Sequence, residues 1–98
     1  MTIEKSSNGD KLIIAVEGRI DTKTAPELES ELNTSLEGVS DLTIDLAKVD
    51  YISSAGLRVL LVAQKCMNHQ GTMTVINAND DLMEIFEITG FTDIFTIK

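Results

Sequence analysis

The sequence predicts a small α/β domain built around a mixed sheet of four to five strands. Apolar runs of strand length alternate with segments of helical periodicity, in the order β-β-α-β-α-β-α followed by a short last strand. Strands that are separated by helices favour parallel β-α-β crossovers of right-handed sense. The length of 98 residues corresponds to one domain covering residues 1–98, and the apolar fraction of 43% is typical of a globular core.

The first two predicted strands form an N-terminal hairpin. Thr2–Ser7 is short and polar, which suits a strand at the edge of a sheet. Asn8 and Gly9 then form a strong turn signal. The next segment, Leu12–Val16, is continuously apolar, which is typical of a strand buried on both faces.

A helix is predicted after this hairpin. Thr24 followed by Glu27 matches a capping box, and Pro26 falls in the first turn, where its missing N–H does no harm. Apolar residues then recur at helical spacing, at Ala25, Leu28, Leu32 and Leu36. Gly38 is expected to end this helix.

The second half of the chain repeats the strand–helix pattern. Leu42–Leu46 and Met73–Ile76 have the character of strands. Between them, apolar residues from Leu57 to Met67 cover most of a helix, so we expect it to be heavily buried, including Cys66. Its predicted exposed side consists of Arg58, Gln64, Lys65 and Asn68. A last helix begins at Asn79–Asp81 and ends at Gly90, and Ile94–Ile97 adds a short strand.

The acidic net charge argues against nucleic acid as a direct partner. Eight basic residues against 16 acidic ones give a net charge of −8, whereas direct binding to nucleic acid needs clustered lysine and arginine. The longest strictly apolar runs, such as Val59–Ala63, are far shorter than the roughly 20 residues of a membrane span, so we expect no membrane association. The single cysteine, Cys66, cannot form an internal disulfide or a zinc site, which favours a reducing compartment and a cytoplasmic location.

The residue types that carry catalysis are poorly represented. His69 is the only histidine and is expected to be solvated near a helix end, without a defined partner. The carboxylates of Asp80, Asp81 and Glu84 fall at a helix start, where they complement the helix dipole. The sequence contains no glycine-rich phosphate loop, metal-ligand pattern or nucleophile elbow. We therefore expect no enzyme activity, no cofactor and no metal.

The segment Asp50–Leu57 is the most informative part of the chain. It connects a strand to a helix, so it places a helix N-terminus at the carboxyl edge of the sheet, where ligands and partners bind in open α/β folds. On composition alone, Ser53 or Ser54 simply caps the helix.

Two short motifs together resemble the STAS domain of bacterial anti-sigma factor antagonists. They are Tyr51–Leu57 (YISSAGL) and Gly18–Asp21 (GRID). In that family the first motif contains Asp-Ser-(Ser/Thr)-Gly-Leu, and its first serine is phosphorylated. The alignment places Ser54 at the phosphorylated position, with Ser53 in place of the aspartate and Ala55 in place of the second hydroxyl residue.

The resemblance implies a protein that alternates between two partners. Unphosphorylated, it would bind an anti-sigma factor that is also a serine kinase, and so release the sigma factor. Phosphorylation of Ser54 would end that binding, and a PP2C-type serine phosphatase would restore it. The residues expected at the partner-binding surface are Asp21, Thr22, Ser53, Gly56 and Arg58. Ser53 competes with Ser54 as the phosphoacceptor, because both hydroxyls lie near the helix start.

Three alternatives stay open on the sequence. The first is a STAS scaffold subunit of a membrane transport ATPase complex, whose interface would not depend on phosphorylation. The second is a nucleotide-binding protein, although no phosphate loop supports it. The third is a redox-sensing role for Cys66, which the apolar surroundings expected for that helix disfavour.

Overall fold

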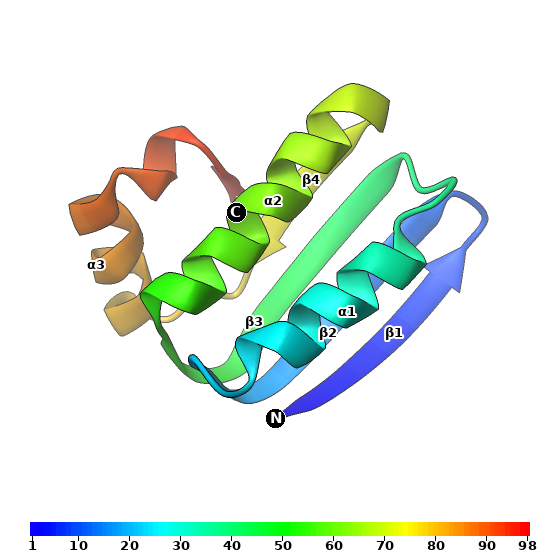
Figure 1. The fold of residues 1–98 in the computed structure, drawn as a ribbon. Helices are drawn as coiled ribbons and strands as arrows, with labels where there is room; N and C mark the ends of the chain where they lie inside the picture. The colour runs from blue at the N-terminus through cyan, green and yellow to red at the C-terminus, as the bar shows by residue number, and fades with distance from the viewer.

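In the computed structural model, which describes Met1–Lys98, five strands form one mixed sheet (Figure 1). The strands are β1 (Thr2–Asn8), β2 (Lys11–Ile20), β3 (Asp41–Ile52), β4 (Thr72–Ile76) and β5 (Thr96–Ile97). The helices are α1 (Ala25–Ser35), α2 (Ser54–Gln70) and α3 (Asp80–Thr89), followed by a 3₁₀ turn at Phe91–Asp93. β1 pairs antiparallel with β2, and every other pair is parallel, so the predicted hairpin and crossovers are confirmed.

The turn of the hairpin lies one residue later than predicted. Asn8 still pairs with Lys11, so the two-residue loop consists of Gly9 and Asp10. Gly9 has a φ of +65°, which lies in the left-handed region that glycine adopts without steric cost.

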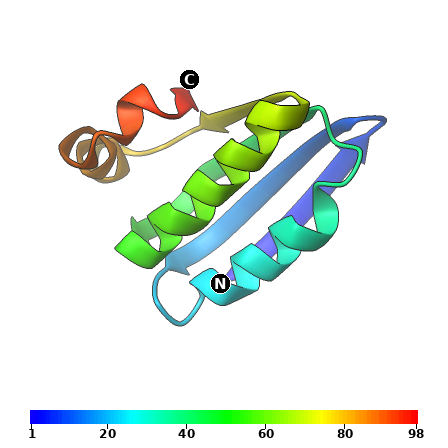
Figure 2. The same cartoon turned by 45° about the horizontal axis from the view of Figure 1, so that its top comes forward.

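The sheet is covered by helices on one face. Because β2, β3 and β4 lie side by side in chain order, right-handed crossovers place α1 and α2 on the same side of the sheet (Figure 2). Leu12 and Ile14 of β2 are buried there, opposite Leu42 and Ile44 of β3. The expectation that Leu12–Val16 is buried on both faces is wrong, since Ile13 points to the uncovered face and is 45% exposed.

The start of α1 differs from the predicted capping box. Thr24 has helical backbone angles and makes no side-chain capping bond. Its hydroxyl oxygen instead accepts a hydrogen bond from Asp21 N–H at 2.8 Å, and its O–H donates to the Arg19 carbonyl oxygen at 2.7 Å. Pro26 lies in the first turn as predicted. α1 ends at Ser35, and the chain turns back toward β3 through Gly38, whose φ is +78°.

α2 has a different exposed side from the one predicted. Gln64 is only 7% exposed, and its Nε2 donates to the Asn68 side chain at 2.9 Å. Val62 is 49% exposed, and Cys66 is half-buried, with its Sγ 3.6 Å from Gln70 Oε1. Cys66 is therefore less buried than predicted: it packs against the core but lines the groove between α1 and α2. No helix in the chain combines the length and the apolar composition needed to span a membrane.

The C-terminal segment is held by an aromatic cluster. Phe95 is 4% exposed; its ring stacks on Phe91 with centroids 5.1 Å apart and meets Phe86 edge-on at 5.9 Å. This cluster joins α3, the 3₁₀ turn and β5, which is only two residues long.

Phe95→Ala should destabilise the protein by about 3 kcal/mol, because it leaves a cavity beside two other rings. Urea unfolding followed by circular dichroism measures this loss. The matched control is Ile88→Ala on α3, a residue that is 77% exposed and whose truncation should change stability by no more than about 0.5 kcal/mol. Equal effects of the two substitutions would contradict an anchoring role for the aromatic cluster.

Candidate functional site

The candidate site lies where β2 and β3 end side by side (Figure 1). Ile20 and Ile52 are paired at these ends, and the backbone N–H of Ser53 donates to the Ile20 carbonyl oxygen at 2.8 Å. The loop that leads from β2 into α1 and the first turn of α2 therefore share one edge. This is the carboxyl edge on which the sequence predicted the site.

The two serines have different structural roles. Ser53 is the N-cap of α2, with an extended backbone, and its hydroxyl oxygen accepts a hydrogen bond from Gly56 N–H at 3.3 Å. Ser54 is the first helical residue, it is exposed, and its hydroxyl makes no hydrogen bond within the protein. The Ser54 hydroxyl is thus free and faces solvent, while that of Ser53 is used to begin the helix.

Gly56 sets how closely α2 approaches the sheet. It is buried, and a Cβ atom at this position would lie 2.6 Å from Ile20 Cγ2 and 2.8 Å from Ile52 Cγ1. The absence of a side chain therefore lets the first turn of α2 rest on the strand ends. Gly56 acts on the site through this packing and offers little exposed surface of its own.

Asp21 organises the loop between β2 and α1. Its Oδ1 accepts hydrogen bonds from the backbone N–H groups of Lys23 at 3.0 Å and Thr24 at 3.1 Å. The N–H of Thr24 contributes most to holding the pKa of Asp21 below its ordinary value; the Lys23 N–H, the Thr24 hydroxyl and Arg19 act in the same direction, and burial opposes them. Asp21 is therefore an anionic turn residue on the same edge of the sheet as the candidate phosphoacceptor.

The remaining predicted residues are exposed on the same edge. Thr22 lies in the β2–α1 loop beside Asp21. Arg58 follows Ser54 by four residues on α2, so the two side chains share one face of the helix. Arg58 makes no salt bridge within the protein, which leaves its guanidinium available to a partner.

Two further residues belong to this edge, and the sequence analysis did not assign them to it. Arg19 and Tyr51 are paired across β2 and β3, and the Arg19 Cζ lies 4.5 Å from the centre of the Tyr51 ring. Tyr51 is 39% exposed. Both residues belong to the two motifs, but their contact depends on the register between β2 and β3, which neither motif contains.

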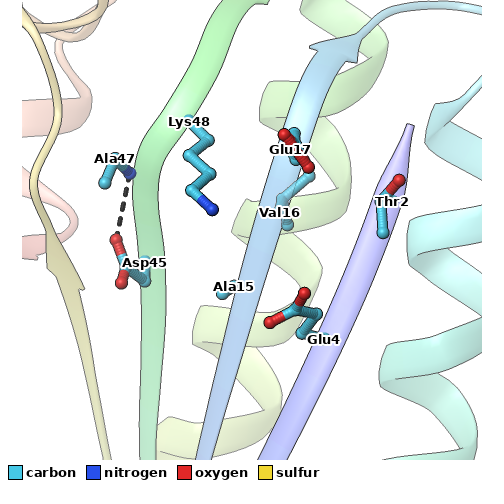
Figure 3. A pocket seen from close by; sticks show the side chains of 8 residues that line it. All are labelled: Thr2, Glu4, Ala15, Val16, Glu17, Asp45, Ala47 and Lys48. Atoms are coloured by element: carbon cyan, nitrogen blue, oxygen red, sulfur yellow. Dashed lines mark hydrogen bonds between the residues drawn. The ribbon is translucent and has the colours of Figure 1, made fainter.

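The edge that carries Ser54 and Asp21 lies apart from two hollows of the molecule. Neither of these hollows includes Ser54 or Asp21. One hollow, of about 210 Å³, lies on the uncovered face among Glu4, Glu17 and Lys48 (Figure 3). No group of three or more histidine, cysteine, aspartate or glutamate residues is arranged to hold a metal ion, and His69 is exposed. An exposed hydroxyl on an open edge is suited to recognition by another protein.

Comparison with known proteins gives a consistent result. The chain is 38% identical over 97 residues to an anti-sigma-B factor antagonist of Listeria monocytogenes, covering 96% of this chain and 84% of that protein. A solved anti-sigma factor antagonist from Mycobacterium paratuberculosis has the same fold, with a TM-score of 0.87 at 24% identity over 98% of this chain and 83% of that one. The Bacillus cell fate determinant SpoIIAA in its phosphorylated form also shares the fold, with a TM-score of 0.77 at 12% identity over 99% of this chain and 91% of that one.

The family model of the STAS domain matches residues 2–98. That match covers every strand and helix described above, including the edge that carries Ser54 and Asp21. The chain therefore belongs to the STAS domain family.

Proposed function

We propose that this protein is an anti-sigma factor antagonist whose activity is switched by phosphorylation of Ser54. In its unphosphorylated form it binds an anti-sigma factor that is also a serine kinase, and the sigma factor is released. The kinase then transfers phosphate from ATP to the Ser54 hydroxyl, and the complex separates. A PP2C-type phosphatase hydrolyses the phosphoserine and restores the binding form.

The free hydroxyl of Ser54 is the observation that carries this proposal. An acceptor must be reachable by a kinase and must not be needed to hold the fold. Ser54 meets both conditions, because it is exposed and makes no hydrogen bond within the protein. Ser53 satisfies these two conditions less well, since it is half-buried and its hydroxyl caps α2. The relatives named anti-sigma-B factor antagonist support the antagonist function itself.

The fold should tolerate the phosphate. A phosphoserine carries about −1.5 to −2 charges. At the first residue of α2, its oxygens meet backbone N–H groups that have no partner within the helix, together with the positive end of the helix dipole. The modification therefore adds charge at a position where the fold itself favours an anion.

We expect the phosphate to act on partner binding, and not on the fold. It would lie on the same edge as the anionic Asp21 and close to the proposed position of the partner, in a protein whose net charge is already −8. Acidic groups of the partner would be repelled, and the phosphate would lose its hydration on contact. A coupling of about 3 kcal/mol corresponds to roughly a hundredfold loss of affinity, which is enough for a switch. Thr22, Ser53 and Arg58 are proposed to contact the partner around this point.

Ser54→Ala should abolish phosphorylation, whereas Ser53→Ala should retain it. The measurement is intact mass after incubation with ATP and the ATPase-fold kinase encoded nearest to this protein. Ser53→Ala also removes a helix cap, so it should lower the stability by about 1 kcal/mol without unfolding the chain. A full phosphate gain in Ser54→Ala would contradict the acceptor assignment. If the wild type binds the kinase but gains no phosphate, the scaffold alternative is favoured.

Ser54→Asp should weaken binding to the anti-sigma factor by about tenfold or more while changing the stability by less than about 1 kcal/mol. Calorimetric titration and thermal unfolding give the two values. Ser6→Asp is the matched control, because Ser6 is exposed on β1 toward the opposite end of the sheet and gains the same charge. A similar loss of affinity in both variants would point to net charge and not to the site.

A further inference from the structure

Two register shifts in β3 place side chains on the uncovered face of the sheet. Ala15 pairs with Asp45, but the next pair is Glu17 with Lys48, so β3 contains one extra residue there. A second extra residue lies between the pairs Gly18–Val49 and Arg19–Tyr51. β-bulges re-aim side chains and are enriched next to functional sites. Because of the second one, Tyr51 and Arg19 face each other on the uncovered side, directly beside the edge that carries Ser54.

Arg19 is held in place there, but its guanidinium keeps hydrogen-bond donors that have no partner. Its guanidinium stacks on Tyr51 at 4.5 Å, and its Nε lies 3.7 Å from Asp21 Oδ2. The terminal nitrogens of the guanidinium make no hydrogen bond or salt bridge within the protein, and the side chain is 60% exposed. The tyrosine ring and the Asp21 carboxylate therefore orient a guanidinium whose outer donors remain free.

We propose that Arg19, oriented by Tyr51, is the anchor that binds a carboxylate of the anti-sigma factor. This inference rests on the proposed function and names the chemistry by which its partner is recognised. The planar fork of an arginine matches a carboxylate through two parallel hydrogen bonds. Arginine and tyrosine are also the residue types that dominate binding energy at interfaces, and an ordered arginine loses less freedom on binding.

The local charge supports an acidic partner surface. The whole chain has a net charge of −8, and Asp50 beside Tyr51 is exposed, but Arg19, Lys23 and Arg58 are also all exposed on the elements that meet at this edge. Asp21 is engaged by the turn that it organises. An acidic patch on the partner would be attracted to these cations before phosphorylation. The same patch would be repelled by phosphate on Ser54, so recognition and switching would use one set of partner charges.

The test is calorimetric titration of the unphosphorylated protein with the anti-sigma factor. Arg19→Ala should weaken binding by about 30-fold. Arg19→Lys keeps the charge but loses the fork, so it should recover only a small part of that loss. Tyr51→Ala should also weaken binding, and Tyr51→Phe, which keeps the ring under Arg19, should bind more tightly than Tyr51→Ala. Thermal unfolding of each variant establishes that it is folded.

Lys11→Ala is the matched control, because Lys11 is an exposed basic residue of the same strand at its opposite end. It should bind within about twofold of the wild type. Wild-type affinity in Arg19→Ala would overturn the inference. Wild-type affinity in Arg19→Lys would overturn the proposed paired hydrogen bonds, since charge attraction alone would then explain the binding. Different outcomes would contradict the proposed function: the wild type would not bind the anti-sigma factor, or Ser54→Asp would bind it as tightly as the wild type does.

Discussion

The junction between the first turn of α2 and the ends of β2 and β3 is the contact on which the candidate site depends. Ser53 N–H is bonded to the Ile20 carbonyl oxygen at 2.8 Å, and the buried Gly56 lets the helix rest on Ile20 and Ile52. These contacts join the end of one strand, the end of its neighbour and the start of a helix. They bring Asp21 and Ser54, which are 33 positions apart in the chain, to one edge of the sheet.

The different roles of Ser53 and Ser54 follow from this junction. A helix start needs one side-chain oxygen to accept an N–H that has no partner within the helix, and Ser53 supplies it. The hydroxyl of the next residue, Ser54, is then not needed to start the helix, although it still lies at the positive end of the helix dipole. A position of that kind can change its charge without a change of fold, which is what a phosphorylation switch requires.

The sequence predicted the elements of the fold well because their signals are local. Apolar periodicity, Pro26 and the glycines that follow the helices indicate where helices and strands begin and end. Local predictions failed where a tertiary contact competed with the local signal. The Thr24 hydroxyl bonds to Asp21 and Arg19 and not to the start of α1, and Ile13 is exposed because the helices cover the other face of the sheet.

The site was predictable to the level of a segment. The motifs identified the edge, and the resemblance favoured Ser54, but only the cap geometry distinguishes its hydroxyl from that of Ser53. The contact between Arg19 and Tyr51 could not be anticipated, since it requires the strand register across 32 positions and the extra residues in β3. A bulge has no reliable signature in a single sequence, so side chains that it redirects are found only in three dimensions.

The order of the strands also bears on how the chain folds. Each strand of the sheet lies beside the one that precedes it in the chain, so no strand has to insert between two others. Contacts between segments close in sequence form early at low entropic cost. We expect the sheet to grow from β1 toward β5, each strand joining the one that precedes it in the chain. The aromatic cluster, which holds the two-residue β5, would then form after the serine-bearing edge.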